Sequence, residues 1–176
     1  SLPMTGRQTG LLFPKPGYSS LNGFSLDLPV FITAGRSYDF TLTPGFFTGA
    51  PLINGVQSPT GVQGPRLNTE FRYFPEARTQ GKVVLGVLYD FRTQRPVDLN
   101  PLIERGTGPR GLRGEFSWLH VEDFNLGFGA RVDASAHSDG DYNRDLTVDV
   151  VASAATYLRS SAKVFQKGDT HYVGLD

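Results

Sequence analysis

The side chains that could do chemistry in this sequence are its histidines, one run of acidic residues and a few glycine-rich stretches. His120, His137 and His171 lack the close spacing of zinc ligands, so we interpret them as ordinary surface or rim residues. A calcium loop starting in the run SDGDYNRD would need glycine at its sixth position and glutamate at its twelfth, where this sequence has Arg144 and Val150. The sequence therefore predicts no metal site.

Nucleotide binding and covalent catalysis are not supported either. The glycine-rich stretch GTGPRG has no following helix whose amino terminus could hold a phosphate group. Serine, histidine and aspartate are all present, but nothing in their spacing positions a catalytic triad. We therefore predict that the chain is not an enzyme and uses no cofactor.

Composition sets the class of protein. The chain has 176 residues, of which 39% are hydrophobic, enough for one ordinary domain with a core. Lysine plus arginine and aspartate plus glutamate both number 17, so no basic field points to a nucleic acid partner. No apolar run approaches the roughly 18 residues of a membrane helix, so a membrane protein with this sequence would cross as strands.

Hydrophobic residues recur with a period of two along almost the whole chain, which predicts an all-β protein. The longest alternating segment starts at Phe124, and less regular strand-like segments are 81–89, 146–154 and 158–167; we find no convincing helix. Apolar positions in or beside the alternating segments include Phe24, Phe40, Phe71, Tyr73, Phe116, Trp118, Phe124 and Phe128. Charged positions on the opposite side are Asp27, Asp39, Glu70, Arg72, Arg113, Glu115, Arg131 and Asp133.

The connections between these segments alternate in length. Short ones are expected at 33–37, 75–80 and 121–123, long ones at 48–65 and 92–110, and a medium one at 136–143. Outer-membrane barrels have short periplasmic turns and longer outer loops, and strands of about ten residues span a bilayer. The pattern predicts a transmembrane antiparallel barrel whose apolar residues face lipid and whose charged residues face a water-filled lumen. The alternative is an open sandwich whose charges face bulk solvent.

The segment 9–31 is expected to form a hairpin that turns at 19–23, and it contains three prolines. Proline lacks an N–H, so Pro14, Pro16 and Pro29 remove ladder hydrogen bonds and belong at an edge that is not fully paired. One interpretation is a weakened seam that can open. The other is edge protection against aggregation, the commoner role of proline in sheets.

Five blocks of sequence carry, in order, a resemblance to a known family. The blocks are RQTGLLFPKPGYSSLNGFSLDLPVF, YDFTLTPGF, LNTEFRYF, RGEFSWLH and SDGDYNRDL. Over about residues 7–167 they resemble the start of the barrel of the LPS-assembly outer-membrane protein family, LptD or OstA. In that family a periplasmic jelly roll receives lipopolysaccharide (LPS) from a periplasmic bridge. A very large barrel, plugged by a lipoprotein partner, then releases LPS sideways into the outer leaflet between its first and last strands.

The resemblance implies roles for parts of this chain. Residues 1–9 would be the junction after a missing jelly roll, and residues 10–176 the first nine or ten strands of a barrel of roughly two dozen, so that the chain is expected to be a fragment of a large transmembrane outer-membrane β-barrel. Pro14 and Pro29 fall on proline positions of the family and Pro16 is an addition; together they would mark a lateral gate. The implied partners are LPS, outer-membrane lipid, a lipoprotein plug and periplasmic LPS-bridge proteins, with no nucleic acid.

The expected function is therefore insertion of LPS into the outer leaflet through a lateral gate near the first strands, in the outer membrane of a Gram-negative bacterium. Two alternatives remain open at this point. One is a passive barrel of the porin or adhesin type, which needs a closed seam. The other is a soluble β-sandwich that binds carbohydrate or protein.

Overall fold

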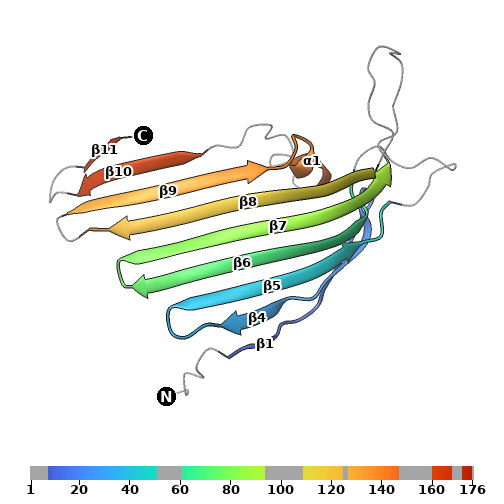
Figure 1. Cartoon of the computed structure of the whole chain (residues 1–176), viewed down its shortest axis with the longest axis horizontal. Coiled ribbons are helices and arrows are strands. Elements are labelled where there is room, and N and C mark those ends of the chain that lie inside the picture. Colours follow the sequence, from blue (N-terminus) through green and yellow to red (C-terminus); the bar gives the residue numbers. More distant parts are fainter. Residues whose placement is uncertain are drawn as a thin grey trace, which may run out of the picture.

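The computed structural model describes residues 8–50, 61–93, 109–124, 127–146, 160–167 and 172–175, and the expected junction at 1–9 lies mostly outside them. The described strands form a single antiparallel sheet, in which the strands from β4 onward follow one another in sequence order (Figure 1). The elements are β1 (Gly10–Leu11), β2 (Lys15–Ser19), β3 (Gly23–Asp27), β4 (Val30–Thr33), β5 (Tyr38–Phe47), β6 (Gly64–Glu76), β7 (Thr79–Thr93), β8 (Pro109–Asp123), β9 (Phe128–His137), α1 (Tyr142–Leu146), β10 (Ser161–Lys167) and β11 (Tyr172–Leu175).

Within the described residues the sheet does not close on itself. β1 lies at one edge and β11 at the other, and the sheet between them is curved (Figure 1). The turns β4–β5, β6–β7 and β8–β9 all lie at the same end of the sheet, which we call the short-turn end (Figure 1). The long connections β5–β6 and β7–β8 leave from the opposite, long-loop end. An open, curved antiparallel meander of this kind is part of the wall of a larger β-barrel.

Strand register gives the sheet one apolar and one polar face. Phe71 in β6 lies opposite Phe40 in β5, and the next residue, Arg72, lies opposite Asp39. Because successive residues of a strand point to opposite faces, this alternation continues along the paired strands. We call the side of Phe71 the apolar face and the side of Arg72 the polar face.

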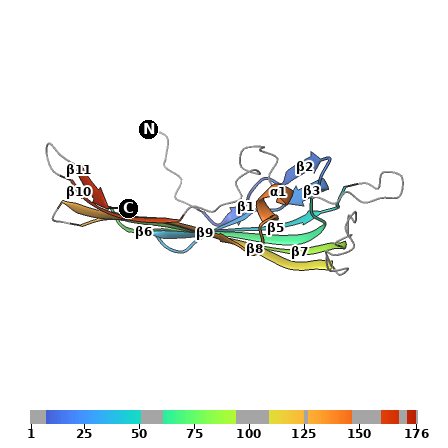
Figure 2. The same ribbon diagram turned by 90° about the horizontal axis from the view of Figure 1, so that it is seen from above.

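The sequence prediction of no helix is wrong at one place. Residues 142–146 form the short helix α1, and β2, β3 and α1 lie on the same side of the sheet, above its long-loop end (Figure 2). Five residues are too few to show a helical period, so the pattern could not reveal α1. The strand expected at 146–154 is not formed at Leu146, and its remainder lies outside the described residues.

The turn expected at 121–123 is also displaced. β8 continues through Asp123, and the chain reverses between β8 and β9, where the Phe124 N–H donates to the Phe128 carbonyl at 2.7 Å. Gly127 has φ 76°, a conformation that glycine adopts at no steric cost. Phe124 therefore lies in a turn and not in a strand, because the position of the glycine decided where the ladder ends.

The buried core is small. Phe47, Val62 and Leu88 form it, and Leu146 of α1 packs against it. A sandwich would need two packed sheets, whereas the described strands form one, so the sandwich alternative is not supported. The described part of the chain contains no helix that is long and apolar enough to cross a membrane.

Candidate functional site

The first hairpin consists of four short strands instead of the two expected. β1 pairs with β4 over only two positions, one of them Leu11↔Val30, whereas β2 pairs with β3 along its whole length. Pro14 lies in the gap between β1 and β2, and Pro29 lies in the gap between β3 and β4. Pro16 lies within β2, which pairs only with β3 among the described strands. Both interruptions of the hairpin therefore coincide with prolines.

The missing donor of Pro29 faces the first strand. The Leu12 N–H donates to the Pro29 carbonyl at 2.8 Å, whereas the Leu28 N–H donates to the Pro44 carbonyl of β5 at 2.9 Å. In a strand, the N–H and C=O of one residue point to the same side, and neighbouring residues point to opposite sides. Pro29 thus removes a hydrogen bond from the seam between β1 and β4 and leaves the pairing with β5 intact.

The tip of the same hairpin is held firmly. Arg92 donates through Nη2 to the Leu21 carbonyl at 2.8 Å, and the Val62 N–H donates to Oδ1 of Asn22 at 2.9 Å. The Gly49 N–H donates to the Asn22 carbonyl at 3.0 Å. The tip is therefore fixed to the ends of β5, β6 and β7, while the seam beside β1 is weakly paired.

A buried ion cluster holds α1 against the polar face. Arg113 of β8 is 4% exposed and donates to Asp139 at 2.7 and 2.9 Å and to Asp145 at 3.0 Å. Asp90 of β7 lies 3.4 Å from the same guanidinium group. Asp90 and Asp145 are both fully buried, so the cluster replaces water around three carboxylates with one cation and hydrogen bonds.

Asp139 and Tyr142, which lie after β9, have shifted pKa values. Burial alone would raise the pKa of Asp139, but hydrogen bonds from Arg113 and Ser138 outweigh it and hold that pKa below its ordinary value. Burial raises the pKa of Tyr142, and the nearby Glu115 carboxylate adds to this effect. At neutral pH the Asp139 carboxylate is charged and Tyr142 is neutral, so the clamp on α1 is complete.

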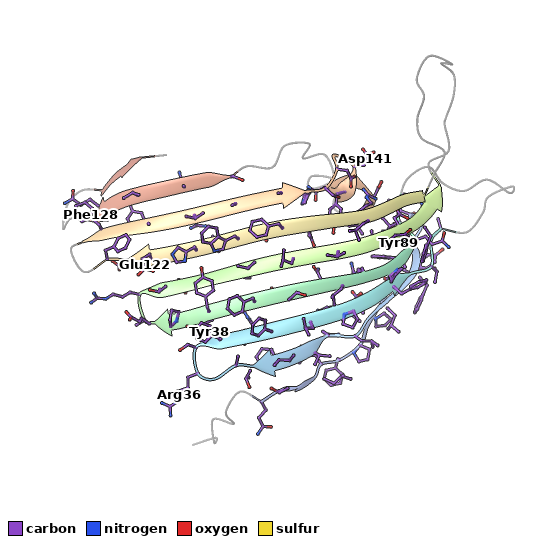
Figure 3. The ribbon with its side chains drawn as sticks, viewed as in Figure 1. Arg36, Tyr38, Tyr89, Glu122, Phe128 and Asp141 are labelled. Carbon is purple, nitrogen blue, oxygen red and sulfur yellow. The ribbon has the colours of Figure 1, made fainter. Side chains whose placement is uncertain are left out.

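The apolar face carries a row of stacked rings toward the short-turn end. Phe71 stacks on Phe40 with ring centroids 4.6 Å apart, and the row continues through Tyr73 and His120 to Trp118. The Tyr73 hydroxyl lies 2.7 Å from Nδ1 of His120 and accepts a hydrogen bond from Trp118 Nε1 at 3.1 Å. Figure 3 shows Tyr38 and Phe128 near the short-turn end and Tyr89 near the long-loop end.

The structure separates the predicted site residues by face. Asp39 and Arg72 form an ion pair at 2.7 Å, and Asp27 pairs with Arg66. The remaining charged residues lie on the polar face at Glu70, Arg113, Glu115, Arg131 and Asp133, opposite the rows that contain Phe40, Phe71, Tyr73, Phe116, Trp118 and Phe128. Phe24 is an exposed residue of β3. That the polar face meets a lumen and the apolar face meets lipid stays a prediction.

Sequence reasoning missed three features of the site. It expected Arg113 in a wet lumen, whereas the residue is buried by Asp139 and Asp145; an arginine in mid-strand and a run of aspartates were the available signal. It treated His120 as an ordinary surface or rim residue, and did not foresee that its ring belongs to the aromatic row. No pattern in the sequence predicted the hydrogen bonds that fix the hairpin tip. Among the described residues no group of three or more histidine, cysteine or acidic side chains could hold a metal ion.

One antiparallel sheet with a polar and an apolar face, short turns at one end and aromatic residues along the apolar face defines the wall of an outer-membrane-type β-barrel. No protein-family model matches the chain. It is 28% identical to the LPS-assembly protein LptD of Ectopseudomonas mendocina over 97% of its length, and 30% identical to that of Pseudoalteromonas atlantica over 99%. It is 31% identical to the LPS-assembly protein LptD of Acinetobacter baylyi over 80% of its length.

Over most of its length the chain is therefore related to the LptD family of LPS-assembly proteins. It spans 16%, 20% and 14% of the length of these three relatives.

Proposed function

We propose that this chain forms the first strands of an outer-membrane translocon barrel that inserts LPS into the outer leaflet, and that the first hairpin is the side of a lateral gate. The observation that carries the proposal is the side of the strand on which Pro29 lacks an N–H donor, which is the side facing β1. Its missing donor weakens the seam between β1 and β4 and spares the seam between β4 and β5. Similarity to LPS-assembly proteins supports LPS as the proposed cargo.

The proposed location is the outer membrane of a Gram-negative bacterium, with the apolar face in lipid. The proposed partners are LPS, outer-membrane lipid, a lipoprotein that plugs the lumen and the periplasmic proteins that deliver LPS. In this arrangement the fixed tip of the hairpin keeps β2 and β3 in place, while β1 separates. The chain has no proposed enzymatic activity.

A disulfide lock tests the gate directly. Leu11 and Val30 are register partners, and directly opposed residues have Cα atoms about 4.5–5.5 Å apart, within the range of a disulfide. The chain has no cysteine, so Leu11→Cys with Val30→Cys introduces the only cysteine pair in this region. In the whole protein, oxidation should reduce delivery of LPS to the cell surface to near zero, and a reductant should restore it.

The matched control is Leu42→Cys with Thr69→Cys, register partners in β5 and β6. This lock joins strands that the proposal keeps paired, so delivery should stay normal. If the β1–β4 lock leaves delivery unchanged, the gate proposal is wrong. If depletion of the whole protein leaves surface LPS unchanged, LPS insertion itself is wrong and a passive barrel becomes the better interpretation.

A further inference from the structure

A cavity of about 210 Å³ lies between α1 and the polar face of the sheet. One water molecule needs roughly 10–15 Å³ of such volume, so the cavity is far larger than a site for a single water. Residues of β6, β7, β8 and α1 line it. The lining includes Arg66, Asn68, Gly86, Leu88, Glu115 and Tyr142.

Three of these residues form one row across the sheet. Gly86 of β7 lies opposite Asn68 of β6 on one side and opposite Glu115 of β8 on the other. A Cβ atom at Gly86 would lie 2.9 Å from Oδ1 of Asn68 and 2.6 Å from Oε1 of Glu115. Because Gly86 has no side chain, the Glu115 side chain and Oδ1 of Asn68 can lie over it, and these two acceptors form the floor of the cavity.

Both acceptors lack a donor in the described structure. Oδ1 of Asn68 is buried and has no hydrogen-bond partner, and Glu115 makes no hydrogen bond or ion pair with any described residue. Arg66, the cationic residue of the lining, is already paired with Asp27. A buried acceptor such as Asn68 Oδ1 is normally satisfied, and the half-buried Glu115 carboxylate can accept further hydrogen bonds, so this floor is suited to a ligand that donates hydrogen bonds.

The rest of the lining narrows the class of ligand. Leu88, Tyr142 and Leu146 supply apolar surface beside the two acceptors. A fatty acyl chain has no donors and would leave Asn68 and Glu115 unsatisfied. A sugar ring offers several hydroxyl donors together with C–H patches, and so matches both parts of the cavity.

We propose that this cavity binds one sugar residue of the saccharide part of the transported glycolipid as it passes along the polar face. The inference rests on the proposed function for the identity of the cargo. The cavity lies between α1 and the strands. Since α1 lies above the long-loop end of the sheet (Figure 2), the cavity would hold the saccharide near the outer mouth of the barrel.

The test uses the whole protein in detergent and, as probe, the lipid-free core oligosaccharide released from LPS by mild acid. Binding is followed by saturation-transfer NMR and titration calorimetry. Gly86→Ala adds a Cβ atom that must displace the Glu115 side chain and Oδ1 of Asn68, and Asn68→Leu removes one acceptor without adding a Cβ atom at Gly86. Each variant should weaken binding about tenfold, the size expected for the loss of one hydrogen bond of roughly 1.4 kcal/mol.

The control is Gly140→Ala, because a Cβ atom at Gly140 in the connection before α1 would meet nothing within 4 Å. It should bind like the unchanged protein. Equal binding by all variants, or no binding by the unchanged protein, would mean that the cavity holds water only, and would overturn the inference. Surface LPS measured in the same cells keeps the two proposals apart: delivery that depends on the protein without any oligosaccharide binding defeats only the sugar site.

Discussion

The first hairpin and the wall formed by β5 to β9 share one alternating sequence pattern, but only the wall has a long continuous ladder. β7 pairs with β8 without a break from Thr79↔Glu122 to Asp90↔Gly111, whereas the hairpin is interrupted at Pro14 and Pro29. Alternation of apolar and polar residues decides which face a side chain occupies, and the backbone donors decide how firmly the strands pair. The two regions therefore differ in how firmly their strands pair, although both have one apolar and one polar face.

The same contrast appears in how each region is supported on the polar face. The wall carries α1, clamped by Arg113 through one ion pair with Asp139 in the connection that follows β9 and another with Asp145 in α1. In the described part of the chain the hairpin has no such helix over it; its tip is held by Arg92, Val62 and Gly49, and Asp27 of β3 pairs with Arg66. Three changes, in order of expected size, test whether this difference in support is real.

The largest effect is expected from Arg113→Leu. Removing the cation takes the Arg113 ion pairs away from the buried carboxylates of Asp90 and Asp145, and breaking a buried pair in this way costs about 3–5 kcal/mol. The free energy of unfolding in urea should fall by that amount. Hydrogen exchange should become faster in α1 and β8, while the β1–β4 seam keeps its rates.

The matched control for this change is Arg131→Leu, because Arg131 is an exposed residue of β9 on the same polar face. A surface substitution of this type usually stays within about 0.5 kcal/mol. Equal destabilisation by the two substitutions would show that the ion cluster has no special place in the wall.

A smaller effect, with the opposite sign for the seam, is expected from Pro14→Ala combined with Pro29→Val. The change restores up to two backbone donors, each contributing about 0.5–1.5 kcal/mol, so opening should become about 10- to 100-fold harder. The barrel should be stable and normally abundant, but should deliver less LPS to the cell surface. Edge protection predicts instead more aggregation with unchanged delivery per folded barrel, and normal delivery by a normally abundant variant would end the gate hypothesis.

The smallest effect is an acid transition of α1. The pKa of Asp139 lies below its ordinary value of 3.8, so its stabilising contribution is complete above that pH and is lost as the pH falls through the lower folded pKa. As the pH falls below 3.8, exchange of the α1 amides should become faster relative to the β5–β6 ladder. In Asp139→Asn this pH dependence should disappear; if it persists, another group controls the docking of α1.

Sequence alone predicts the features that repeat locally. The period of two marks the two faces, and the register agrees for rows such as Phe40↔Phe71 and Asp39↔Arg72. The prolines predict an interrupted hairpin because each removes a donor wherever it lies. The boundary of the β8–β9 turn was misplaced because several residues near it suit either a strand or a turn, and the positive φ of Gly127 decided between them.

The tertiary structure alone decided which residues meet. Arg113 and Asp139 are 26 positions apart, and Arg92 and Leu21 are 71 apart, so no local period can show that they are hydrogen-bonded. α1 forms where this long-range clamp holds five residues that would be too few for a stable isolated helix. The direction of the missing donor at Pro29 is likewise set by strand pairing, because a sequence records that an N–H is absent but not which neighbour loses the hydrogen bond.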